Sequence, residues 1–95
     1  MKMITAVVRP FKLDELRQAI GQLGVQGVTV TEVHEPRYGP RVKLEIAVDD
    51  PIAEPVLEAL SNIARTGRSG DGRVMLTQIE QAIRIRTRET GPAAT

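Results

Sequence analysis

The segment from Arg65 to Leu76, RTGRSGDGRVML, concentrates residues suited to anion binding around one aspartate. Its glycines and arginines are Gly67, Gly70, Gly72, Arg65, Arg68 and Arg73. Glycine permits positive φ and close backbone approach, so successive amides can point at one anion, and arginine adds charge and forked donors. Phosphate is the natural partner of such a loop. The segment matches neither a P-loop nor a GxGxxG fingerprint, so a solvated turn between a helix and a strand is the plain alternative.

A second group of arginines lies near the end of the sequence, in AIRIRTRET. Arg84, Arg86 and Arg88 alternate with isoleucines, which predicts an extended segment with the arginines on one side. Such arginines either bind an anion or protect an edge strand from pairing with another chain. The pattern alone does not choose between these two interpretations.

Length and composition limit the kind of protein. The chain has 95 residues, which suits one compact domain, and 13 basic against 12 acidic residues give a net charge of +1. This balance predicts no general attraction to nucleic acid or membrane surfaces, so any anion site must be local. There is no cysteine, which excludes disulfides, thiolate zinc sites and cysteine nucleophiles.

Other features bear on location and metals. The opening apolar run stops at Arg9 and Pro10, too short for a membrane span or a signal-peptide core, so we expect a cytoplasmic protein without direct membrane insertion. His34 is the single histidine, and one imidazole does not make a metal site. No prosthetic group is expected.

Hydrophobic periodicity predicts six elements. Strands are expected at residues 3–8, 28–33, 42–48 and 73–79, and amphipathic helices within 12–24 and 49–67. The order strand, helix, strand, strand, helix, strand is that of the α+β ferredoxin-like βαββαβ sandwich, with two helices on one face of an antiparallel sheet. The first strand is apolar on both faces, so we expect the open face to pack against sister subunits. One domain is expected over residues 1–90, with a flexible tail over 91–95.

Four motifs in order carry a family resemblance: RPFKLDE, GVTVTEV, TGRSGDGR and RIRT. With them, nearly the whole chain except Glu35–Gly39 resembles the PII signal-transduction proteins. The resemblance implies a homotrimer that holds an adenine nucleotide (ADP, AMP or ATP) in each cleft between neighbouring subunits. It also implies a regulator of nitrogen or carbon metabolism, not an enzyme, that reports to a transporter or another protein through a protruding loop.

The resemblance also assigns roles by position. Gly70, Gly72 and Arg73 would hold phosphate, with Arg84 and Arg86 contributed by the neighbouring subunit. Val7, Thr29 and Glu45 would frame adenine and ribose. The candidate nucleotide-binding residues are Val7, Thr29, Arg41, Glu45, Gly70, Asp71, Gly72, Arg73, Arg84 and Arg86.

The main departure from the family is the segment HEPRYGPR, which stands where PII proteins have a long loop. That loop carries a glutamine for magnesium and 2-oxoglutarate and, in some bacteria, a modified tyrosine. We therefore expect 2-oxoglutarate sensing to be lost, and we interpret Tyr38 as an ordinary turn residue. Arg41 replaces a lysine that serves phosphate, which keeps the charge and changes its geometry. The shortening is either natural or an engineered deletion.

Several alternatives stay open. A carboxysome-associated PII-like sensor of bicarbonate and AMP or ADP would use Arg37, Arg41 and nearby backbone for the small anion. A small acylphosphatase-like enzyme would use a similar phosphate cradle on the same fold. A structural trimer with a vestigial cleft would bind no nucleotide.

Overall fold

The computed structural model describes residues 1–25 and 27–94. In chain order its elements are β1 (Lys2–Val8), the 3-10 helix η1 (Pro10–Lys12), α1 (Leu13–Gln22), β2 (Thr29–Glu35), β3 (Gly39–Val48), α2 (Asp50–Ala64), β4 (Gly72–Gln78) and the 3-10 helix η2 (Gly91–Ala94). All the predicted helices and the four predicted sheet strands form, with ends that shift by a few residues.

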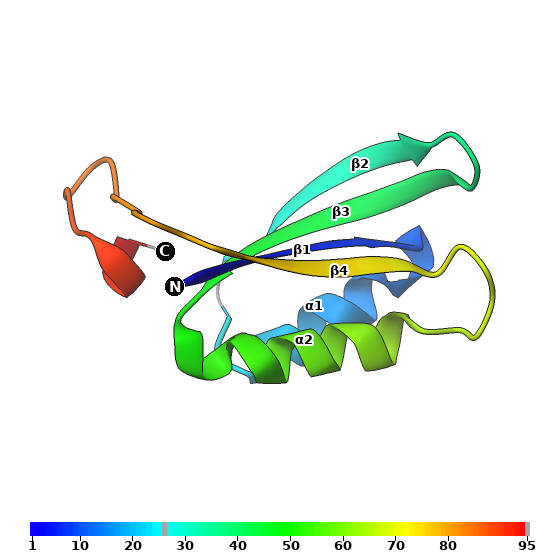
Figure 1. Cartoon of the computed structure of the whole chain (residues 1–95), viewed down its shortest axis with the longest axis horizontal. Coiled ribbons are helices and arrows are strands. Elements are labelled where there is room, and N and C mark those ends of the chain that lie inside the picture. The colour runs from blue at the N-terminus through cyan, green and yellow to red at the C-terminus, as the bar shows by residue number, and fades with distance from the viewer. Residues whose placement is uncertain (26, 95) are drawn as a thin grey trace.

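The strands make one sheet in the order β2-β3-β1-β4, and each neighbouring pair is antiparallel. Both helices lie against one face of this sheet (Figure 1). The ferredoxin-like fold predicted from the sequence is therefore confirmed. The β2–β3 turn and the loop between α2 and β4 lie together at one end of the molecule, at the right of Figure 1.

The core lies between the sheet and the helices. Alternate residues of the central strands point into it, as the period of a strand requires. The core residues that are almost completely buried include Ile4, Ala6, Val8, Leu16, Ile20, Leu44, Ile46, Val56 and Leu60. Each fully buried aliphatic side chain of this size stabilises the fold by about 1.5–3 kcal/mol. This packing fixes the two central strands, and so fixes the loops at their ends.

The residues Asp49 and Pro51 predict an Asp cap with Pro51 at the first position of α2, and the structure follows this pattern with one change. The side chain of Asp49 accepts a hydrogen bond from the amide of Asp50 at 2.9 Å, which satisfies one of the first helical donors. Pro51 is then the second residue of the helix and not the first, because the helix begins at Asp50.

The face of the sheet away from the helices carries the other set of alternating side chains. Thr5 pairs with Glu45 on one side and with Met75 on the other. Met75 is 44% exposed, whereas Val7 on the same strand as Thr5 is only 4% exposed, because other residues of its own subunit cover it. Cover of this face by sister subunits stays a prediction.

The structure corrects the prediction of an extended segment that carries Arg84, Arg86 and Arg88 on one side. The chain instead folds back, with an isolated bridge between Ile83 and Thr90. The Arg84 amide donates to the Glu89 carbonyl at 2.8 Å, and Arg88 has a φ of 64°. This segment lies beyond the end of β4, at the left of Figure 1, where no strand of the sheet can pair with it. Its backbone groups are therefore satisfied locally.

The end of the chain was predicted to be a flexible tail. Gly91–Ala94 form η2, and the amide of Gly91 donates to the carbonyl of Ala82 at 3.2 Å. Thr95 lies outside the described residues. The division into a domain over 1–90 and a tail over 91–95 stays a prediction.

Candidate anion-binding site

Asp71 organises the loop between α2 and β4. Its carboxylate accepts hydrogen bonds from the amides of Thr66 and Gly67 at 2.7 and 3.0 Å, and from the Thr66 hydroxyl. It also accepts from Nε of Arg9 at 3.0 Å, and this bond ties the loop to the end of β1. The hydrogen bond from the Thr66 hydroxyl is the largest of the effects that hold the pKa of Asp71 well below its usual range. Asp71 therefore shapes the loop through contacts within the protein.

Two glycines allow the loop to approach neighbouring segments of the chain. Gly72 has a φ of 108°, and a Cβ there would lie 1.8 Å from the carbonyl oxygen of Val7. Gly70 has a φ of 91°, and a Cβ there would lie 2.7 Å from the ring of Tyr38. Both positions need the left-handed conformation that glycine adopts without strain. The glycines thus place the loop against β1 and against the β2–β3 turn.

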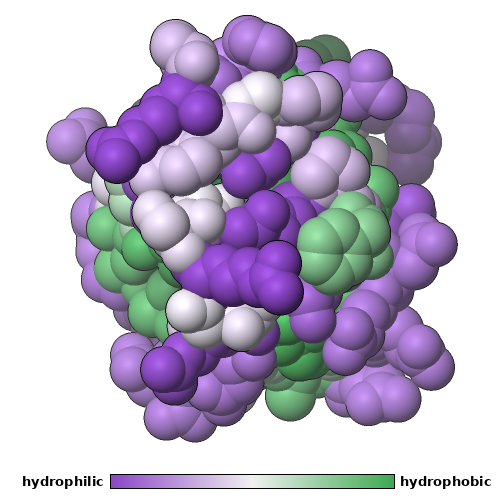
Figure 2. All heavy atoms as spheres, turned by 90° about the vertical axis from the view of Figure 1, so that its right-hand side faces the viewer, coloured by the Kyte–Doolittle hydropathy of each residue, from purple (hydrophilic) through white to green (hydrophobic). Residues whose placement is uncertain are grey.

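A hollow of about 300 Å³ lies between this loop and the β2–β3 turn. We call it the cradle, and its lining is Val7, Glu35, Tyr38, Arg41, Arg68, Gly70, Asp71, Gly72 and Arg73. Figure 2 faces this end of the molecule and shows a surface on which hydrophilic residues dominate. The fold therefore brings together six of the ten candidate residues, those at positions 7, 41, 70, 71, 72 and 73.

The arginines of the cradle are engaged in different ways. Arg41 is buried, and its guanidinium donates to the carbonyl oxygens of Tyr38, Pro40 and Gly70 at 3.1, 2.7 and 3.1 Å. Arg73 is about half exposed, and its Nη1 lies 2.8 Å from Oε1 of Glu35. Arg41 is thus a structural tie between the turn and the loop, while Arg73 presents an exposed cation to the cradle.

Four residues at the site were not identified from the sequence. Arg9 holds the loop through Asp71 and through the carbonyl of Ser69 at 2.9 Å. The hydroxyls of Tyr38 and Ser69 lie 3.0 Å apart, and Glu35 pairs with Arg73. These partners are separated by 31 to 62 positions in the sequence, so no local pattern signals the contacts.

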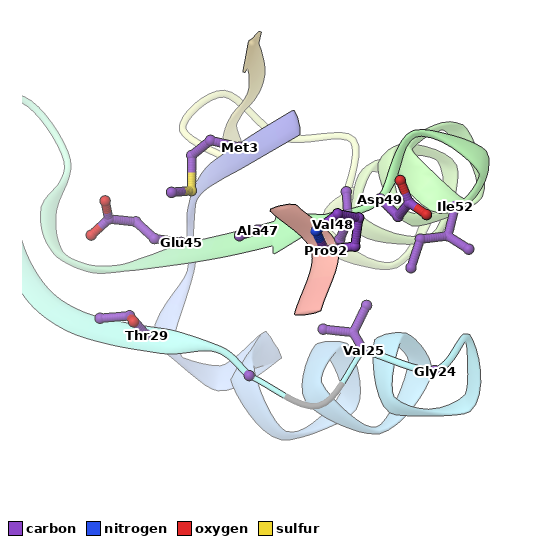
Figure 3. A pocket seen from close by; sticks show the side chains of 11 residues that line it. Met3, Gly24, Val25, Thr29, Glu45, Ala47, Val48, Asp49, Ile52 and Pro92 are labelled. Carbon is purple, nitrogen blue, oxygen red and sulfur yellow. The ribbon is translucent and has the colours of Figure 1, made fainter. Parts of the chain in front are cut away.

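Two further candidates lie in a second hollow. This hollow of about 530 Å³ is formed where β3 ends and α2 begins, and its lining includes Thr29, Glu45, Ala47 and Asp49. Thr29 and Glu45 are direct partners in the register of β2 and β3, and Figure 3 shows both at one side of the hollow. The two hollows share no lining residue.

The last two candidates, Arg84 and Arg86, line neither hollow of their own subunit. Nε and Nη2 of Arg84 both donate to the carbonyl of Ala93, at 3.3 and 3.2 Å. Arg86 is exposed in the turn that closes the C-terminal segment. Within one subunit these arginines therefore do not join the other candidates.

The described part of the chain has neither a metal-binding cluster nor a membrane-spanning helix. Among residues 1–25 and 27–94, no group of three or more His, Asp or Glu side chains could hold a metal ion. In the same residues, no helix has both the length and the apolar character needed to cross a membrane.

The fold and the cradle define a ferredoxin-like domain with a glycine- and arginine-lined loop at one end of its sheet. The family described as nitrogen regulatory protein P-II matches residues 1–89. The nitrogen regulatory protein P-II of Rhizobium meliloti is 44% identical over 108 aligned positions, which cover 96% of each chain. Those of Rhodospirillum rubrum and Azospirillum brasilense are 42% and 39% identical, again over 96% of each chain. The chain therefore belongs to the PII family of signal-transduction proteins, which are regulators and not enzymes.

Proposed function

We propose that this PII protein binds the phosphates of an adenine nucleotide in the cradle and acts as a nucleotide-responsive regulator. The observation that carries the proposal is the cradle itself, where Gly70, Gly72 and Arg73 meet around a hollow of about 300 Å³. Backbone amides of a glycine loop and an arginine fork suit the oxygens of a phosphate group. ADP, AMP and ATP share this chemistry, and calorimetric titration distinguishes them.

The proposed nucleotide lies between two subunits of a homotrimer. Of the three candidates for adenine and ribose, Thr29 and Glu45 line the second hollow and Val7 lines the cradle. A nucleotide with its phosphates in the cradle of one subunit and its base in the second hollow of the next would use both. The same arrangement gives Arg84 and Arg86 a role at the neighbouring cradle, and the exposure of Met75 on the open sheet face supports association of subunits.

We further propose that 2-oxoglutarate sensing is lost. The β2–β3 connection consists of a short turn over residues 36–38. The alignments to the P-II relatives extend over 108 positions, more than the 95 residues of this chain, so those relatives have residues that this chain lacks. Arg41 gives little support to a bicarbonate site, because its guanidinium already donates to three carbonyl oxygens.

Calorimetric titration tests the proposal directly. The purified protein is titrated with AMP, ADP and ATP in turn, each with and without magnesium plus 2-oxoglutarate, and with bicarbonate as a separate additive. We expect saturable binding of one nucleotide per subunit and no tightening by 2-oxoglutarate. Absence of binding to all three nucleotides would contradict the proposal and favour a structural trimer.

Two further measurements complete this test. Sedimentation equilibrium gives the number of subunits, for which we expect three. Hydrolysis of simple acyl phosphates distinguishes a regulator from a small enzyme on the same fold. Turnover that depends on Arg73 would favour the enzyme, because a binding protein has no need to position an attacking water.

A further inference from the structure

The cradle contains an acidic side chain at the point where an anion is expected. Oε1 of Glu35 lies 2.8 Å from Nη1 of Arg73, and both residues line the hollow. Glu35 is the last residue of β2 and Arg73 the second residue of β4, so the pair joins the two edge strands of the sheet. The carboxylate thereby occupies a guanidinium donor that a phosphate oxygen would use.

The position of Glu35 is fixed by the turn that follows it. The amide of Tyr38 donates to the carbonyl of Glu35 at 3.1 Å, and the Tyr38 hydroxyl contacts Ser69 at 3.0 Å. Arg41 bonds the same turn to Gly70. These contacts hold the turn against the loop, and so keep the carboxylate of Glu35 within reach of Arg73.

The charges of the lining make this contact important for an incoming anion. The lining holds the cations Arg41, Arg68 and Arg73 and the anions Glu35 and Asp71. Arg41 and Asp71 are committed to contacts within the protein. Arg68 and Arg73 are thus the two cations that the loop offers to the ligand, and Glu35 pairs with Arg73. Its carboxylate also repels a phosphate that approaches Arg73.

We propose that Glu35 is an internal competitor for the ligand phosphate, so that binding requires its carboxylate to leave Arg73. This proposal rests on the proposed function in that the ligand is a phosphate compound. Departure of Glu35 removes a tether at the base of the β2–β3 turn. Binding of the ligand in the cradle thereby releases the turn from Arg73. The conformation of this short segment then depends on whether the ligand is bound.

The test compares Glu35→Gln with the wild type, using ADP and inorganic pyrophosphate as probes in calorimetric titrations. Glutamine keeps the shape of the side chain and removes the charge. We expect both probes to bind more tightly to the variant, because the competing carboxylate is gone. The ion pair of Glu35 and Arg73 is partly exposed and therefore weak, so the gain in affinity should be only roughly threefold to tenfold. Glu32→Gln is the matched control: it removes the same charge from the same strand, but Glu32 does not line the cradle and its affinities should equal the wild type.

A second signal comes from Tyr38, because the chain has one tyrosine and no tryptophan. We expect its fluorescence to change on binding in the wild type, with a smaller change in Glu35→Gln, whose turn has already lost the tether. Circular dichroism confirms that the variants are folded.

Each outcome of the titrations decides a different point. Equal affinity of wild type and Glu35→Gln for both probes overturns the competitor role and leaves nucleotide binding intact. Tighter binding of pyrophosphate without any binding of ADP supports the competitor and refutes the nucleotide proposal. Failure of both proteins to bind either probe rejects both proposals.

Discussion

The guanidinium of Arg41 donates from Nη2 to the carbonyl oxygen of Gly70 at 3.1 Å, and this bond joins the β2–β3 turn to the glycine-rich loop. Nη1 of the same group donates to the carbonyls of Tyr38 and Pro40. A lysine ammonium is a single point of charge and cannot span this set of acceptors as a planar fork does. The planar fork of Arg41 thus provides the tie between the short turn and the loop.

Arg41→Ala tests this tie. The change removes three partly buried hydrogen bonds from a charged donor, so we expect the free energy of unfolding to fall by about 2–3 kcal/mol. Urea denaturation at one fixed protein concentration measures it. Arg37→Ala is the control in the same turn: Arg37 lies 5.4 Å from the ring of Tyr38 and is exposed, so its loss should cost less than about 1 kcal/mol. Equal costs for the two variants would contradict the structural role of Arg41.

Gly72→Ala tests the close approach of the loop to β1. A Cβ at 1.8 Å from the Val7 carbonyl oxygen cannot be accommodated without moving backbone, and φ of 108° adds strain. We expect a loss of at least about 3 kcal/mol in the free energy of unfolding. Gly21→Ala makes the same chemical change within α1, where nothing lies within 4 Å, and should stabilise by about 0.5–1 kcal/mol. A Gly72→Ala variant as stable as the wild type would show that the loop is not held in this way.

Asp71→Asn tests the organisation of the loop through its pH dependence. The pKa of Asp71 is lowered in the folded protein, first of all by the hydrogen bond from Thr66. Its carboxylate therefore stabilises the fold fully above its unfolded pKa of about 4, and this contribution is lost as the pH falls further. We expect the free energy of unfolding of the wild type to fall more steeply below about pH 4 than that of Asp71→Asn. Parallel pH profiles for the two proteins would be inconsistent with an ionised Asp71 as the centre of the loop.

The double variant Arg84→Ala, Arg86→Ala tests the proposed contribution of the neighbouring subunit. If both side chains make charge-assisted contacts with phosphate, nucleotide affinity should weaken by roughly 2–4 kcal/mol in a calorimetric titration. Arg17→Ala removes an exposed arginine of α1 and should leave the affinity unchanged. An unaltered affinity in the double variant would refute the phosphate role of these arginines.

The fold was predictable from the sequence because it depends on periodic patterns. Alternation in Val42–Val48 and the helical stripe through Leu16 and Ile20 both mark residues that are buried in the structure. The same reasoning failed for residues 83–88, whose alternation is typical of a strand, because residues 1–25 and 27–94 place no strand beside this segment. A local pattern indicates what a segment can form and not whether a partner is present.

The candidate site was predictable in part. The glycine and arginine content of the loop identified most of the cradle, since those residue types carry the chemistry themselves. Other contacts form only on folding. Glu35 pairs with Arg73, and Asp71 accepts hydrogen bonds from Thr66 and Arg9. From the sequence alone, each of these side chains could equally pair with other residues. Such assignments need the three-dimensional structure.

The central position of β1 has a consequence for the order of folding. Val8 at its end pairs with Gly72 at the start of β4, so the first strand of the chain completes its pairing only with the last. Contacts so distant in sequence close slowly, and they close late in a chain that emerges from the ribosome from its N-terminus. The cradle is built where these two strands meet, so it forms only once nearly the whole domain has been synthesised.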